Sequence, residues 1–203
     1  MLIEVITSEP WPAVSVDDVK MSQRIMHSLE DPLIDRAIRA ATRYLARTYQ
    51  ISIVASTVRV SLPAWPQELE LPSPPLRYSG APSNAVRIGR LVDGAVVDSP
   101  GLYAVGHRDQ VWTISRISNV MPAIDETPFS FRVECDVGYE TAAVIPEDIQ
   151  SAIILLAGHL YQNREAVVIE PRVITVPRSL ELGVEALMKH YRVQTRYVNA
   201  WSA

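Results

Sequence analysis

The chain has 203 residues, of which 48% are hydrophobic, and its formal net charge at pH 7 is −4. This composition supplies a core for one large domain or for one domain that carries an insertion. The acidic balance argues against a protein that holds nucleic acid by charge, and the single cysteine, Cys135, excludes an internal disulfide and any multi-cysteine metal site.

The first residues do not match a targeting segment. They contain Glu4 and Glu9 and no basic stretch, so they do not resemble a secretory signal. No apolar run in the chain reaches the roughly 20 residues that cross a bilayer. We therefore expect a protein that is made in the cytoplasm and has no membrane partner.

Two helix-start signals come before residue 52. Ser15 followed by Asp18 resembles a capping box and predicts a short helix from about 16 to 27. Asp31-Pro32 predicts a second helix that continues to about residue 49, with Asp31 as its N-cap. One face of this second helix is apolar and carries Ile34, Ile38, Ala41, Leu45 and Thr48. The opposite face carries Arg36, Arg39, Arg43 and Arg47.

The middle of the chain has the two-residue period of β-strands. "TVRVSL" (57–62) and "FSFRVECDV" (129–137) alternate apolar and polar residues, which predicts half-buried strands. "AVRIGRLVDGAVV" (85–97) predicts a hairpin around Asp93-Gly94. "GLYAVG" and "QVWTI" add short strands, so the β segment covers about 52 to 140.

The chain then returns to a helical period. "PEDIQSAIILLAGHLYQNREAV" (146–167) begins with Pro146, which fits a first helical turn. Its apolar stripe consists of Ile149, Ile153, Leu156 and Leu160. "SLELGVEALMKHYRV" predicts a last helix up to residue 193, and "QTRYVNAWSA" has no period and predicts an arm or tail.

This order of helices, strands and helices predicts an α+β fold. The expected architecture is a helical bundle built from the N- and C-terminal segments, with an inserted antiparallel β-domain and a C-terminal arm. The expected parts are an N-terminal arm and helices (1–51), a β-rich insertion (52–140), C-terminal helices that complete the bundle (141–193) and a tail (194–203).

The sequence offers no catalytic site. His159 follows Glu147 and Asp148 by a distance of roughly 16–18 Å along a helix axis, so these groups cannot share a metal or a proton within that helix. Phosphate-loop, dinucleotide-binding, nucleophile-elbow and zinc-helix motifs are absent from the sequence. Cys135 shares its strand face with apolar residues, which favours a core thiol. We expect no enzyme activity, no cofactor and no metal.

Two features indicate binding of a partner. At about 100° per residue, Arg36, Arg39, Arg43 and Arg47 fall within about 80° of one another. They form either a solvated face or a contact with an acidic protein or DNA phosphate. Single-stranded nucleic acid is bound by cations with interleaved aromatics, and only Tyr44 lies near, so protein is favoured over DNA. The tail holds Tyr197 and Trp201, which are types enriched in interface hot spots, so it either docks on a partner or folds back.

Residues 131–167 have a strand that ends in Gly138-Tyr139, a helix begun by Pro146, then His159, Tyr161 and the end Asn163-Arg164-Glu165-Ala166. This order resembles the head–tail connector (adaptor) proteins of tailed phages and gene-transfer agents. "VPRSLELGVEALMKHYRV" is similar to the final helix of that family, and "SLEDPLIDRAIRAATRYLARTY" resembles its helix of the form D-x-L-I-x-x-x-I-x-x-A. "LELPSPPL" resembles its proline-containing strand exit. The resemblance covers about 15 to 193, with 84–128 matched by strand pattern alone.

The resemblance implies a structural role. The chain would form a dodecameric ring under the portal protein, in the neck of a virion, and would line the channel through which DNA passes without sequence-specific binding. Its partners would be the portal, neighbouring copies of itself and a stopper on the tail side. The four arginines, Tyr197 and Trp201 would bind the portal or a neighbouring subunit. The alternatives are a stopper or tail-terminator protein, an enzyme with an unrecognised site and a nucleic-acid-binding module.

Overall fold

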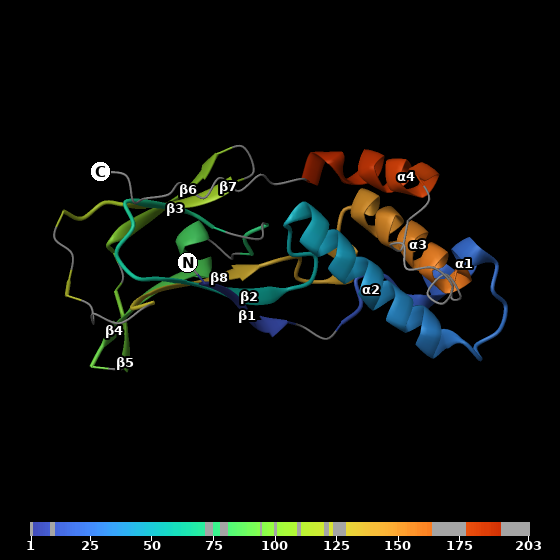
Figure 1. Ribbon diagram of the computed structural model, residues 1–203, viewed down its shortest axis with the longest axis horizontal. Coiled ribbons are helices and arrows are strands. Elements are labelled where there is room, and N and C mark those ends of the chain that lie inside the picture. The colour runs from blue at the N-terminus through green and yellow to red at the C-terminus, as the bar shows by residue number, and fades with distance from the viewer. Residues whose placement is uncertain are drawn as a thin grey trace, which may run out of the picture. The chain divides into compact units, whose positions relative to one another are not determined.

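The computed structural model describes residues 2–8, 11–71, 75–77, 81–93, 95–99, 101–108, 111–119, 122–123, 129–163 and 178–191 (Figure 1). The chain divides into two compact units. Residues 2–8 and the described part of 54–140 form the β unit, and residues 11–53 and the described part of 141–191 form the helical unit. The predicted α+β class and the antiparallel pairing are confirmed.

Two antiparallel sheets build the β unit. The larger sheet has the order β1-β2-β8-β4-β5, with the bounds β1 (Leu2–Ser8), β2 (Ser56–Leu62), β8 (Phe131–Val137), β4 (Val86–Val92) and β5 (Ala95–Asp98). The smaller sheet has the order β3-β7-β6, with the bounds β3 (Glu68–Glu70), β7 (Val111–Arg116) and β6 (Tyr103–Arg108). A 3-10 turn, η1 (Pro82–Ala85), precedes β4. The predicted hairpin is present, because β4 and β5 pair antiparallel on either side of residues 93–94.

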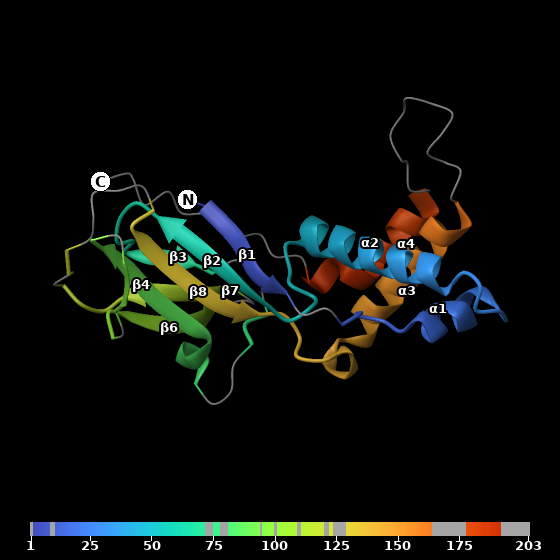
Figure 2. The same cartoon turned by 90° about the horizontal axis from the view of Figure 1, so that it is seen from below.

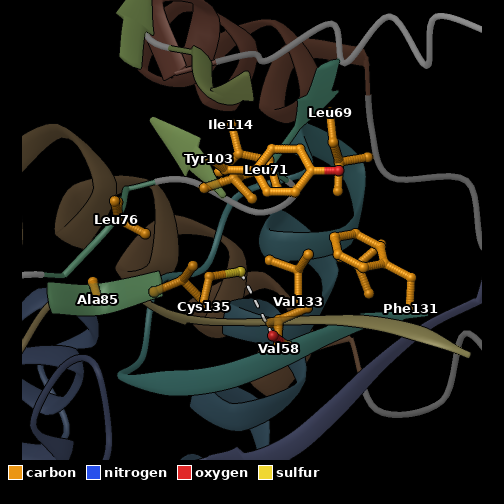
Figure 3. Packing of buried hydrophobic residues seen from close by; sticks show 12 residues of the cluster. Val58, Leu69, Leu71, Leu76, Ala85, Tyr103, Ile114, Phe131, Val133 and Cys135 are labelled. Carbon is orange, nitrogen blue, oxygen red and sulfur yellow. Dashed lines mark hydrogen bonds between the residues drawn. The ribbon is translucent and has the colours of Figure 1, made fainter. Parts of the chain in front are cut away.

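The core of the β unit lies between its two sheets. Alternate residues of β2 and β8 face inward in register, with Val58 opposite Cys135 and Val60 opposite Val133. Figure 3 shows Tyr103 and Ile114 of the smaller sheet facing these residues. Aromatic rings extend the cluster, since the ring centroids of Phe131 lie 4.8 Å from Trp65 and 5.7 Å from Tyr103. The hydroxyl of Tyr103 donates a hydrogen bond of 2.7 Å to the carbonyl of Pro66, so its buried polar group is satisfied.

Four α-helices form the helical unit: α1 (Val16–Gln23), α2 (Asp31–Tyr49), α3 (Glu147–Gln162) and α4 (Arg178–Met188). Short 3-10 turns, η2 (Ala142–Val144) and η3 (Lys189–Tyr191), accompany them. Helix α3 contacts each of the other three. Figure 1 shows it between α2 and α4, and in the view of Figure 2 α2 and α4 overlap with α3 beside them. Three of the four residues of its predicted apolar stripe are buried, Ile149 and Ile153 fully and Leu156 nearly so. The fourth, Leu160, is only partly buried.

The structure corrects several predicted helix ends. Helix α1 stops at Gln23 rather than near residue 27, because Arg24 adopts a left-handed conformation (φ 57°) and its N–H bonds the carbonyls of Lys20 and Met21. The capping box of Ser15 and Asp18 is present. At the start of α2 the N-cap is Glu30, not Asp31. Asp31 instead accepts a hydrogen bond of 2.9 Å from Nζ of Lys20.

Other single positions also differ from the prediction. Thr48 is exposed and Tyr49 is buried in its place, so the buried face of α2 turns slightly at its last turn. Phe129 lies before β8 rather than in it, has φ 67° and is exposed. The last helix ends at Met188 and tightens into η3, earlier than residue 193. Residues 2–8, expected to be an arm, form the edge strand β1 of the larger sheet.

Candidate partner-binding surface

The arginines of α2 form an exposed face, as their spacing predicts. Pro32 stands in the first turn of the helix, where its missing N–H costs no hydrogen bond. The core side of α2 is fixed by Ile34, Ile38 and Leu45, which are fully buried. Opposite them the structure places four exposed arginine side chains: Arg36, Arg39, Arg43 and Arg47.

One of these arginines is paired within its own helix. Arg39 lies 2.5 Å from the carboxylate of Asp35, one turn earlier, in a largely exposed ion pair. Within the part of the chain that the structure describes, none of the other three arginines makes an ion pair. The α2 surface therefore keeps positive charge that an acidic partner can neutralise.

The same face is hollowed. A shallow hollow of about 460 Å³ is lined, among the described residues, by Ala40, Arg43, Tyr44, Arg47 and Thr48. Tyr44 is 50% exposed, so its ring is available for contact. An aromatic ring flanked by arginines is a common composition of protein interfaces.

The helical unit also carries acidic side chains that the sequence analysis did not select. Glu181 and Glu185 are exposed one turn apart on α4, and Glu147 and Asp148 are exposed in the first turn of α3. Burial raises the pKa of the Tyr191 hydroxyl, and the nearby carboxylate of Asp148 raises it further. The i, i+4 spacing of Glu181 and Glu185 can be read from the sequence. It indicates a binding face only when a cationic face with similar spacing is also known.

Four charged groups on the larger sheet, Arg59, Arg87, Glu134 and Asp136, are paired with one another across strands. Nη2 of Arg59 donates to Glu134 at 2.6 Å, and Arg87 donates to both carboxylate oxygens of Asp136 at 2.9 and 3.0 Å. The hydroxyl of Thr57 adds a bond of 2.8 Å to Asp136. The hydrogen bonds from Arg87 hold the pKa of Asp136 below its ordinary value, and the same bonds raise the pKa of Arg87. Cross-strand pairs of this kind stabilise a sheet.

His159 belongs to the C-terminal end of α3 and contacts Asn163 there. It lies in the last turn of α3, while Glu147 and Asp148 lie in the first turn of the same helix. Its Nδ1 is 2.9 Å from the side-chain amide of Asn163. Among the described residues no group of three or more His, Cys, Asp or Glu side chains is arranged to hold a metal.

Cys135 is a core residue. Its side chain is fully buried, and its thiol lies 3.6 Å from the carbonyl oxygen of Val58 (Figure 3). Burial raises the pKa of the thiol to about 12, helped by the neighbouring charge of Asp136. A thiol that is protonated at neutral pH and shielded from solvent does not act as a nucleophile.

Two exposed apolar surfaces were not predicted from the sequence: strand β1 and the connection between α1 and α2. Every residue of β1 is exposed, including Val5 at 65%, although β1 pairs with β2 along one edge. In the connection between α1 and α2, Met26 and Leu29 are 96% and 88% exposed. Exposed apolar side chains gathered in this way are typical of protein contacts. The β-branched residues Ile3, Val5 and Ile6 were a usable signal for a strand.

Tyr197 and Trp201, the two tail residues predicted to bind a partner, lie outside the described residues. Among the described helices, none has both the length and the apolar character that a membrane crossing needs.

Comparison with known proteins identifies the fold. No family model and no curated protein matches the sequence. Three solved structures contain chains of similar fold: the neck of an empty gene transfer agent (GTA) particle computed with C6 symmetry, the virion of a native GTA particle, and the neck of a native GTA particle computed with C12 symmetry. The TM-scores are 0.71, 0.72 and 0.68, at 20%, 20% and 18% identity.

Each of these matches covers 98% of this chain and 100% of the other chain. At such identities the likeness is one of fold, and it extends over nearly the whole length. The resemblance to head–tail connector proteins that the sequence indicated is thereby confirmed at the level of the fold: this chain is built like a chain found in gene transfer agent particles.

Proposed function

We propose that the chain is a structural subunit of the neck of a phage or phage-like particle, an adaptor that forms a ring under the portal protein and links the capsid to the tail. The observation that carries the proposal is the match in fold over 98% of the chain to chains in GTA necks. The two necks were computed with C6 and C12 symmetry, which supports repeated copies around an axis.

The surface of the molecule supports the same role. Three surfaces are suited to contacts with other proteins: the exposed arginine face of α2, the exposed apolar residues on β1, and the exposed connection between α1 and α2. Its partners in this role are the portal, neighbouring copies and a stopper on the tail side. Arg36, Arg39, Arg43, Arg47, Tyr197 and Trp201 bind the portal or the neighbouring subunit.

The charge of the chain suits a conduit for DNA. A channel that held phosphates tightly would stall the genome, because each phosphate neutralised by a cation adds to affinity. At a net charge of −4 the subunit lets duplex DNA pass without sequence-specific binding. The adaptor acts by assembly, without enzyme activity, cofactor or membrane, and its place is the neck of a virion assembled in the bacterial cytoplasm.

The test is reconstitution with the portal. The full chain is mixed with the portal protein of the same particle, the mass of the complex is measured, and the neck is imaged. A ring of this chain seated directly on the portal supports the adaptor role. A ring that joins only further down the neck identifies a stopper or tail-terminator protein. Binding of duplex DNA tighter than about 10⁻⁶ M at physiological salt, without portal binding, would instead identify a nucleic-acid-binding module.

A further inference from the structure

The helical unit exposes two helix faces of opposite charge, on α2 and on α4. We propose that the arginine face of α2 in one copy binds the glutamate face of α4 in the next copy around the ring. This inference rests on the proposed function and names the partner of its arginine face as a second copy of this chain.

The α2 face is a cationic surface with an apolar side. Arg43 and Arg47 stand one turn apart and line the hollow together with Tyr44. Tyr44 is half exposed. Arg36 continues the positive row toward the start of the helix. Within the described residues Arg36, Arg43 and Arg47 have no ion pair, so their charge is available to a neighbour.

The α4 face has the complementary composition. Glu181 and Glu185 are exposed one turn apart, and Leu182 between them is 57% exposed. Val184 and Met188 face the core and fix the rotation of the helix. Leu182 adds an exposed apolar side chain to this acidic face.

The spacing on the two helices allows two ion pairs at once. Residues four apart on a helix are about 6 Å apart along its axis. Arg43 and Arg47 can therefore meet Glu181 and Glu185 in one crossing of two helices. Packed helices lie about 8–10 Å apart, which brings Tyr44 and Leu182 into contact beside the ion pairs.

The position of the two helices favours a ring over a closed dimer. Both α2 and α4 pack on α3, and Figure 1 shows α3 between them. Their outward faces therefore point to opposite sides of the same unit. A contact between two different faces of identical subunits is heterologous and repeats from copy to copy until a ring closes.

The test exchanges charge between the two faces of the full chain. The first variant carries Arg43→Glu and Arg47→Glu, and the second carries Glu181→Arg and Glu185→Arg. Each variant alone brings like charges together, and we expect its self-association to be about 100-fold weaker than that of the wild type. Mixed in equal amounts, the two variants restore opposite charge at every contact of an alternating ring, so the mixture should assemble again.

The measurement is the mass of the assembly at low ionic strength, where charge contacts are least screened, with and without portal. Asp17→Arg is the matched control, since Asp17 is an exposed charge of the same unit on α1, outside the surfaces proposed to bind a partner, and its reversal should leave assembly unchanged. The melting curve of each variant checks folding. If one double variant does not fold, Arg47→Glu mixed with Glu185→Arg repeats the exchange.

The other outcomes overturn the proposal. Variants that assemble as the wild type does would show that these faces are not the contact. An arginine variant that forms rings but loses the portal, or loses duplex DNA, would assign the α2 face to that partner instead. A wild-type chain that forms a ring on the portal, with no response to either exchange, would refute this contact and leave the proposed function standing. A wild-type chain that never joins the portal or itself would refute both.

Discussion

Substitution of Gly138 by alanine tests the close contact between the residue that follows β8 and the backbone of Val54. Gly138 has φ +88°, in a region that side chains disfavour. A Cβ atom placed on it would lie 2.3 Å from the carbonyl oxygen of Val54 and 2.7 Å from the carbonyl carbon. Both are backbone atoms, and the segment is held by the bond from the N–H of Gly138 to the carbonyl of Pro75 and by the bridge between Val54 and Tyr139.

The expected cost has two parts. An L-residue in a left-handed conformation costs about 1–2 kcal/mol. Moving backbone to relieve an overpacked contact costs about 1–3 kcal/mol more. Gly101 supplies the control, because it has φ +76° and a Cβ there would meet nothing within 4 Å. Gly101→Ala should therefore cost the conformational part alone.

Thermal and urea unfolding of the full chain measure the difference. At about 2–4 °C per kcal/mol for a protein of this size, Gly138→Ala should lower the melting temperature by about 4–20 °C. Gly101→Ala should lower it by about 2–8 °C. Equal losses at the two positions would show that the Val54 carbonyl moves freely and that the close approach does not restrain the fold.

Three further predictions test other parts of the structure. Leu156→Ala should destabilise by about 2–5 kcal/mol, because the side chain is buried in α3, whereas Arg39→Ala should change stability by only about 0.5 kcal/mol; equal denaturation midpoints would place the helix faces wrongly. Asp136→Asn should cost about 1 kcal/mol at neutral pH, since the ion pair is partly exposed. The folded pKa of Asp136 is lowered, so the stabilisation is complete above the unfolded pKa of about 3.9. It disappears as pH falls through the folded value, and a deficit that is constant across an acid titration would contradict this. Deletion of 194–203 should leave the melting temperature nearly unchanged and abolish portal attachment; docking of the truncated chain at full affinity would show that the tail is not the anchor.

The helices and inner strands were predictable because burial imposes a period on the sequence. Ile34, Ile38 and Leu45 recur at helical spacing and are all fully buried. In β8 the alternation from Phe131 to Val137 matches the burial pattern residue by residue. These signals are local, since each depends only on which side of one element faces the core.

The ends of elements and the order of strands were less accessible. The stop of α1 depends on the left-handed backbone of Arg24, which no apolar period records. Strand β8 lies between β2 and β4, and its paired residues are 69–81 positions away in sequence for β2 and 41–49 positions away for β4. Strand β1 was missed because its residues are exposed on both faces, so burial imposes no alternation on it.

The candidate surface was predictable in part for a related reason. The arginine face of α2 was visible because the opposite, buried face fixes the rotation of the helix. From its charge alone, three interpretations of this face remained possible: a solvated face, a protein contact and a phosphate contact. The structure adds the hollow beside Arg43 and Arg47 and the exposed glutamates of α4, which are properties of folded elements and of their neighbours.

A net acidic chain that gathers exposed arginines on one helix presents a physical conflict if DNA passes nearby. Unpaired arginines attract phosphate, and each phosphate they bind slows release. In the proposed ring the conflict is resolved by assembly, because Arg43 and Arg47 of each copy are neutralised by Glu181 and Glu185 of the next. The pairing neutralises cations and anions in equal number, so each subunit in the ring keeps its net charge of −4. Because the paired arginines no longer attract phosphate, an assembled ring should bind duplex DNA more weakly per subunit than the free chain does. A measurement in which the ring binds more tightly would argue that the arginines face the channel.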